Sequence, residues 1–152
     1  MNLTRLLTEE AEMILVEATA ALGQNHHSPA GTAGRQRLRA LYALVLQSVQ
    51  QGDVATMSTY ADKVAQQRFL AGSDLDEAQT TFNVLEASIW QHVVASVPAA
   101  ELPEAISQVN ATLNAGKDAL ARAYVTLARQ NRTPCLNIPL LFSGTDAVLM
   151  EA

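Results

Sequence analysis

Arg68, Trp90 and His92 are the side chains in this sequence best suited to binding chemistry. His92 falls at the edge of an apolar stripe, where burial lowers the pKa of an imidazole. Such a ring could sense pH, ligate haem iron or accept a phosphoryl group. Arg68 extends an apolar helix face with a charge, so it could anchor the following turn or recognise an anionic ligand. These three residues are the candidate ligand-binding residues of the sequence. The interpretation that we favour for each polar residue is structural, namely a core or edge histidine and an arginine whose stem packs while its charged end reaches solvent.

The remaining histidines and the single cysteine form no recognisable catalytic or metal-ligating set. His26 and His27 are adjacent in a Gly/Pro-containing loop, without further ligands at metal-binding spacing. Cys135 has no His or Asp at catalytic spacing, so we predict that it packs. The motifs of phosphate loops, dinucleotide sites, zinc proteases and serine hydrolases are also missing from the sequence. We therefore expect a protein that is not an enzyme and uses neither a metal nor a cofactor.

Charge and composition restrict the partners and the compartment. The 152 residues carry a net charge of −5, which gives no general attraction to nucleic acid or to an anionic membrane. A basic cluster of Arg35, Arg37 and Arg39 is predicted to be a solvated edge or, alternatively, a docking surface for an acidic partner. Glutamates interrupt the N-terminal apolar residues, and no uncharged run is long enough to cross a bilayer. With one cysteine and therefore no internal disulfide, these features predict a cytoplasmic protein.

Helices must position these residues, because helix-forming side chains dominate and only 5% of the residues are aromatic. We predict an all-α fold of five or more helices in a globin-like or bundle arrangement, with a short irregular C-terminal tail. Residues 1–131 would form one regulatory domain, and the apolar, Pro-containing residues 132–152 would pack on it or on a partner. The predicted helices span about 2–22 and 35–51, the segment between Asp53 and Gly72, the segment from a Ser73 or Asp74 cap to Pro98, and about 102–129.

The fourth predicted helix has the clearest start and the broadest apolar stripe. Ser73 or Asp74 can cap it while Asp76 or Glu77 reaches back to the cap. The breadth of the apolar stripe predicts that this helix is central and is enclosed by neighbours on more than one side. The stripe consists of Leu75, Ala78, Phe82, Leu85, Ile89 and Val93, widened by Trp90, Val94 and Val97.

The fifth predicted helix carries apolar or small residues at spacings that alternate between four and three. This heptad pattern is typical of a helix that packs along a partner helix over its whole length, so we predict a homodimer interface here. Gly116 within the pattern indicates a close approach of backbones. The interface would consist of Leu102, Ile106, Val109, Leu113, Gly116, Leu120, Ala123 and Leu127.

The stretch from residue 60 to residue 94 resembles the N-terminal domain family of the RsbT co-antagonist proteins, which are regulators of bacterial stress signalling. The resemblance is carried by Arg68 near a helix end, by Gly72 with the following small residue and the Leu75 cap, and by Ile89-Trp90. It implies a non-haem, globin-like sensory domain that dimerises through its helices and passes a signal to an output domain. After the helices we expect only the short apolar tail in place of the phosphorylatable output domain usual in that family.

From the resemblance and the motif-poor sequence together we expect a non-enzymatic signalling domain that acts as a homodimer and through a signalling-protein partner. The alternative is a globin-like sensor that binds haem or a small ligand through His92, with Trp90 and Arg68 near the cavity.

Overall fold

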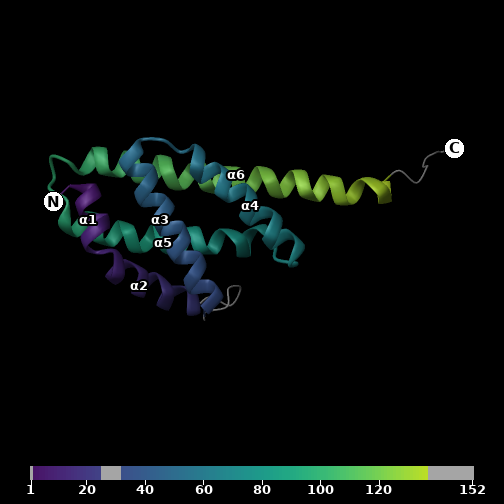
Figure 1. The fold of residues 1–152 in the computed structure, drawn as a ribbon, viewed down its shortest axis with the longest axis horizontal. Coiled ribbons are helices and arrows are strands. Elements are labelled where there is room, and N and C mark those ends of the chain that lie inside the picture. The colour runs from purple at the N-terminus through teal and green to yellow at the C-terminus, as the bar shows by residue number, and fades with distance from the viewer. Residues whose placement is uncertain (1, 25–31, 137–152) are drawn as a thin grey trace. The chain divides into compact units, whose positions relative to one another are not determined.

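The described part of the chain is helical throughout. The computed structural model describes residues 2–24 and 32–136, and within these ranges it contains six α-helices and no strand (Figure 1). The predicted all-α fold is therefore confirmed. The helices are α1 (Leu3–Glu9), α2 (Ala11–Gly23), α3 (Thr32–Gln51), α4 (Ala55–Leu70), α5 (Leu75–Ser96) and α6 (Leu102–Leu136).

The chain divides into two compact units, Met1–Ala121 and Arg122–Ala152, and the division falls within α6. The first unit contains α1–α5 and the beginning of α6. The predicted irregular tail was expected to start at residue 132, but α6 continues through Pro134 to Leu136. This is possible because a proline removes one backbone hydrogen bond and crowds one carbonyl, yet still adopts helical dihedral angles. The rest of the predicted tail lies outside the described residues.

The first predicted helix is in fact two helices, which meet at Glu10. Glu10 has φ −103° and ψ 13°, outside the helical range, and it ends α1 and precedes α2. No Gly or Pro marks the break in the sequence. The carboxylate of Glu10 instead binds side chains of α5, so a tertiary contact accompanies the break and a continuous helix was the wrong prediction.

Glycines end α3 and α4 as the sequence predicts. Gly52 has φ +67° and Gly72 has φ +86°, a backbone conformation that L side chains rarely adopt. At Gly72 the amide of Ser73 donates to the Arg68 carbonyl and the amide of Gly72 donates to the Phe69 carbonyl. This pair of hydrogen bonds is the Schellman motif, which turns the chain from α4 towards α5.

Asp74 caps α5 in a reciprocal capping box. Its side chain accepts a hydrogen bond from the Glu77 amide at 2.8 Å, and the Glu77 carboxylate accepts one from the Asp74 amide at 3.0 Å. Of the two caps and two partners that the sequence offered, the structure uses Asp74 and Glu77. Both amides would otherwise lack a partner in the first turn.

We expect Asp74→Ala to lower the free energy of unfolding by about 1 kcal/mol, because the cap hydrogen bond is lost. Urea denaturation followed by circular dichroism measures this change. Asp76→Ala is the matched control: it removes the same charge from the same turn but no cap hydrogen bond, so we expect a loss of only a few tenths of a kcal/mol. Equal losses in the two variants would contradict the prediction.

Helix α5 is central to the first unit, as predicted, since α1, α2, α3 and α4 all pack against it. Phe82, Leu85, Ile89 and Val93 of the apolar stripe are buried. The stripe is narrower than predicted, because the side chain of Val94 is 64% exposed.

The middle of the heptad pattern of α6 is buried within the first unit. Val109, Leu113, Gly116 and Leu120 are buried. A Cβ placed on Gly116 would lie 2.6 Å from Cε2 of Phe82. The glycine therefore makes room for a buried aromatic side chain of α5, and the nearest atoms belong to side chains and not to the neighbouring backbone that the sequence predicted. These four residues cannot also form the surface of a dimer, and for them the predicted interface is wrong. The end positions Leu102, Ile106, Ala123 and Leu127 are partly exposed.

Candidate functional site

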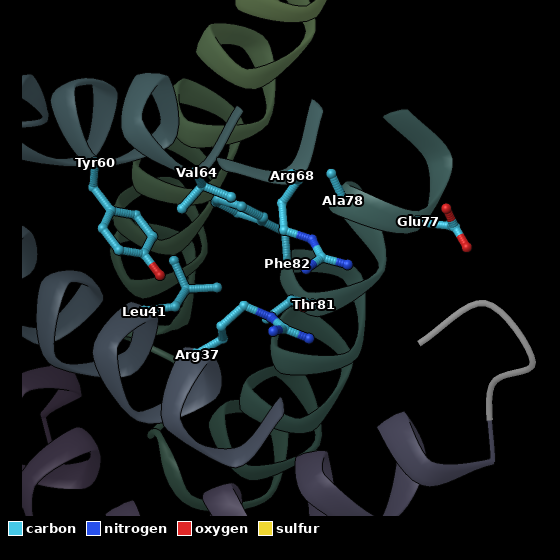
Figure 2. Close-up of a pocket in the computed structure, with 9 residues that line it drawn as sticks. All are labelled: Arg37, Leu41, Tyr60, Val64, Arg68, Glu77, Ala78, Thr81 and Phe82. Carbon is cyan, nitrogen blue, oxygen red and sulfur yellow. The ribbon is translucent and has the colours of Figure 1, made fainter. Parts of the chain in front are cut away.

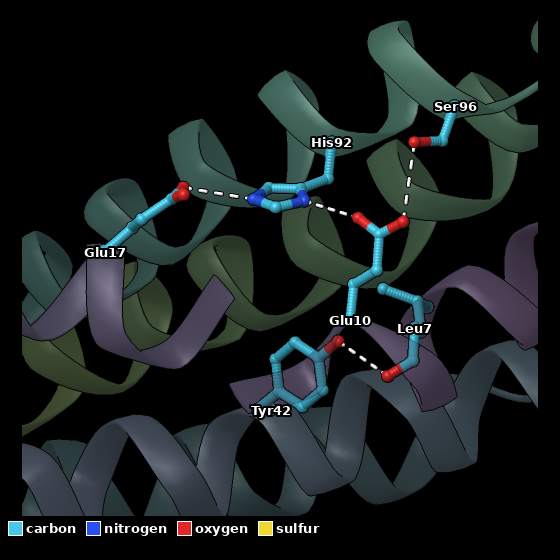
Figure 3. Close-up of polar contacts among 6 residues, drawn as sticks. All are labelled: Leu7, Glu10, Glu17, Tyr42, His92 and Ser96. Atoms are coloured by element: carbon cyan, nitrogen blue, oxygen red, sulfur yellow. Dashed lines mark hydrogen bonds and ion pairs between the residues drawn. The ribbon is translucent and has the colours of Figure 1, made fainter. Parts of the chain in front are cut away.

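His92 of α5 lies between two carboxylates from the N-terminal helices (Figure 3). Its Nδ1 is 2.5 Å from Oε1 of Glu10, and its Nε2 is 3.1 Å from Oε1 of Glu17. Both ring nitrogens donate when the ring is protonated, so the geometry matches an imidazolium that bridges the two acids. We refer to His92, Glu10 and Glu17 as the His92 clamp.

The clamp is better shielded on the Glu10 side than on the Glu17 side. The side chains of His92 and Glu10 are 11% and 20% exposed, whereas that of Glu17 is 45% exposed. The hydroxyl of Ser96 donates to the other carboxylate oxygen of Glu10 at 3.4 Å. Water therefore screens the contact to Glu17 more strongly than the contact to Glu10.

The surroundings of His92 raise its pKa above the ordinary value of 6.5. Burial alone lowers it, because desolvation disfavours the charged ring. The hydrogen bonds and charges of the two carboxylates act in the opposite direction and together outweigh burial. Close by, Tyr42 of α3 donates to the Leu7 carbonyl at 2.7 Å, and burial followed by the Glu10 charge raises the pKa of its phenol.

The clamp leaves His92 no ring nitrogen for a metal. Haem iron and phosphoryl groups both require a neutral imidazole nitrogen with a free lone pair. In the structure Nδ1 and Nε2 each contact a carboxylate. The arrangement therefore does not support the haem-ligating role considered for His92.

A second polar site lies between α3, α4 and α5, at the pocket drawn in Figure 2. Arg37 of α3 and Arg68 of α4 both line it, and both side chains are partly buried. Nη2 of Arg68 donates to the Ser73 hydroxyl at 2.6 Å, which ties the end of α4 to the turn before α5. This contact matches the turn-anchoring interpretation of Arg68. The other residues that line the pocket are Leu41, Tyr60, Val64, Glu77, Ala78, Thr81 and Phe82.

The structure does not bring Arg68, Trp90 and His92 together, so the predicted three-residue site is wrong as a single site. His92 lies fourteen positions after Ala78 in α5, and Ala78 lines the pocket beside Arg68. At a rise of 1.5 Å per residue these positions are about 21 Å apart along the helix. Trp90 is partly exposed and lines neither site.

The basic cluster divides between two sides of α3, because Arg35 and Arg39 line one pocket beside α2 and Arg37 lines another. Arg35 is exposed, Arg37 turns into the pocket, and Arg39 makes a two-point ion pair with Glu12 of α2 at 3.0 and 3.1 Å. The cluster therefore does not act as one basic surface. Positions two residues apart on a helix do not face the same way, which separates Arg37 from Arg35 and Arg39, whereas Arg35 and Arg39 are four residues apart and share a side.

The structure adds partners that the sequence analysis missed. Glu10 and Glu17 are seven residues apart, a spacing that returns to the same side of a helix, and this could have indicated a shared contact. Tyr60 gives no sequence signal of its own, and Arg37 was noted only as part of the basic cluster, because only the packing of α3 against α4 brings the two residues to Arg68.

The structure also bears on the remaining histidines, the cysteine, and the possibility of a metal site or a membrane-spanning helix. His26 and His27 and the side chain of Cys135 are outside the described residues. Among the residues that are described, no group of three or more His, Cys, Asp or Glu side chains has a geometry that could hold a metal ion. None of the described helices combines the length and apolar character needed to cross a membrane.

Comparison with known proteins identifies no relative: no family model, no curated protein and no solved structure matches this chain.

Proposed function

We propose that the protein is a non-enzymatic regulatory domain of the bacterial cytoplasm that acts through helix–helix contacts with a second protein chain, in the first place another copy of itself. One observation carries the proposal. The heptad pattern of α6 continues past the buried residues of the first unit into the second unit, where Ala123 and Leu127 are partly exposed.

An apolar heptad pattern requires a neighbouring helix. Apolar residues at alternating spacings of four and three are stable when a neighbouring helix covers them, at about 25 cal/mol for each Å² removed from water. Val109, Leu113 and Leu120 are covered within the chain. Ala123 and Leu127 repeat the same spacing and remain partly open to solvent. A second chain would cover them.

A regulatory role also agrees with the resemblance to the N-terminal domains of RsbT co-antagonist proteins, which implies an all-helical sensory domain. In such a domain the signal is a small shift of packed helices. The His92 clamp provides a polar contact between the N-terminal helices and α5 that a shift of this kind would break or form. Stress signalling would then reach a separate partner protein.

We expect sedimentation equilibrium of the chain at micromolar concentration to show a reversible dimer. Leu127→Glu should weaken the dimer at least about tenfold, equivalent to 1.4 kcal/mol, because it places a charge in the apolar contact. Thr126→Glu is the matched control, since it adds the same charge at the adjacent, exposed position. A strict monomer, or equal weakening by both variants, would overturn the homodimer.

A further inference from the structure

Three cations line an open groove between α3 and α4. Arg37, Lys63 and Arg68 contribute their side chains to this groove, which has a volume of about 370 Å³. No carboxylate lines it. The remaining lining residues are Gln36, Ala40, Tyr60, Val64 and Gln67. Such a concentration of positive charge is unusual in a chain whose net charge is −5, so it cannot be attributed to general composition.

The groove continues into the pocket of Figure 2, because Arg37, Tyr60, Val64 and Arg68 line both. The inner pocket measures about 10 Å³, which leaves room for little more than one water molecule. A ligand would therefore lie in the outer groove with its charged end against the two guanidinium groups. Only the outer groove has the size of a small-molecule site.

The two arginines have no acidic partner in the described residues. Neither makes an ion pair, and Arg68 uses one of its five N–H donors for Ser73. Glu77 is the one carboxylate that lines the inner pocket. It accepts a hydrogen bond from the Asp74 amide, and Figure 2 shows it directed away from both guanidinium groups.

An anion would stabilise this site, because the guanidinium groups of Arg37 and Arg68 are partly buried and close to each other. Burial, and after it the charge of Arg68, lowers the pKa of Arg37. Placing two guanidinium groups together at a partly buried site is unfavourable unless an anion compensates them. An oxyanion would accept hydrogen bonds from both groups at once.

We propose that this groove is a binding site for a small molecule that carries a phosphate group, with the phosphate held by Arg37 and Arg68. A phosphate dianion matches the three positive charges of the groove better than a single carboxylate does. Lys63 adds charge without a fixed geometry, and the amides of Gln36 and Gln67 can bind polar groups on the body of the ligand. The proposal is independent of the proposed dimer.

Isothermal titration calorimetry of the full chain tests the site, with inorganic phosphate, glucose 6-phosphate and glucose as the probes. We expect the two phosphates to bind and glucose not to bind. Arg37→Gln and Arg68→Gln should each raise the Kd for phosphate at least about tenfold, because each removes a charge-assisted contact. Arg35→Gln, which removes the same charge from an exposed position of α3, should leave the Kd unchanged.

A second measurement separates binding from folding. Without ligand, Arg37→Gln should unfold at the same temperature as the wild-type chain or at a higher one, because it relieves the repulsion from Arg68. On addition of phosphate, the wild-type chain and Arg35→Gln should gain thermal stability, and Arg37→Gln should gain less. Absence of phosphate binding at millimolar concentration, or equal weakening by Arg35→Gln, would overturn the proposal. Binding of a glutamate-rich peptide in place of phosphate would also overturn it and favour an acidic protein partner.

Discussion

Replacing Gly116 with valine is expected to lower the free energy of unfolding by about 3 kcal/mol, the upper part of the range for overpacked cores. A Cβ at this position would lie 2.6 Å from Cε2 of Phe82 and 3.1 Å from both Cγ and Sδ of Met57. Phe82 is 1% exposed and Met57 is fully buried, so neither side chain can move into solvent. The gain in helix propensity over glycine, less than 1 kcal/mol, does not offset this crowding. Thermal or urea denaturation measures the loss.

Ala111→Val is the matched control, because it adds two methyl groups at an exposed position of the same helix. We expect it to cost about 0.5 kcal/mol, from helix propensity alone. A double-mutant cycle of Gly116→Ala with Phe82→Leu tests the contact itself. The smaller Leu side chain should accommodate the new methyl group, so the double variant should be more stable than the sum of the single losses predicts. Additive losses, or a Gly116→Val variant no less stable than Ala111→Val, would contradict this account of the packing.

Local signals in the sequence were sufficient for most helix boundaries. Gly52 and Gly72 end helices with a positive φ, and Asp74 begins one with a capping box. These features depend on residues that are neighbours in the chain, so they can be read without knowing the fold. Gly116 belongs to this group only in part. Its place in an apolar heptad pattern indicated close packing, but the atoms that pack against it belong to the side chains of Phe82 and Met57 and not to a neighbouring backbone.

Features that depend on the choice of neighbour could not be predicted in the same way. The heptad pattern of α6 indicates that a partner helix is required but not whether the partner is in the same chain, and its middle turned out to pack within the chain. The break at Glu10 has no local cause, because the contact that accompanies it is with a histidine 82 residues away. Val94 fits an apolar stripe by type and is nevertheless 64% exposed.

The polar partners of the candidate site residues also depend on the choice of neighbour, so they could not be predicted from the sequence. The sequence identified His92 and Arg68 as unusual because each places a polar group near an apolar stripe. It did not identify the groups that determine their chemistry, since Glu10, Glu17 and Arg37 come from other helices. The two residues therefore belong to two different sites, one with acidic partners and one with a second cation.

The His92 clamp is expected to make the stability of the chain depend on pH. The pKa of His92 is raised in the folded chain, so protonation favours folding. The contribution of the clamp is fully present below the ordinary value of 6.5 and is lost as the pH rises through the raised pKa. At about pH 5.5, where carboxylates are ordinarily ionised, His92→Gln should lower the free energy of unfolding by about 2 kcal/mol, as for a hydrogen bond to a charged group.

At about pH 8.5 the difference between the wild-type chain and His92→Gln should be smaller, because a larger share of the wild-type imidazole is then deprotonated. Urea denaturation at both pH values measures it. Gln91→Ala, at an exposed neighbouring position, is the control and should show no pH-dependent difference from wild type. If the free energies of unfolding of wild type and His92→Gln changed in parallel with pH, the proposed effect of the His92 clamp on stability would be contradicted.

A titration of His92 followed by NMR tests the two carboxylates separately, since the spectrum of His92→Gln assigns its resonance among the three histidines. Glu10→Gln should lower the pKa of His92 more than Glu17→Gln does. The reason is that Glu10 is 20% exposed and only 2.5 Å from the ring, whereas Glu17 is 45% exposed and 3.1 Å away. Solvent weakens the more exposed contact. A larger decrease in Glu17→Gln would place the dominant charge on α2 and would contradict the shielding that the structure shows around Glu10.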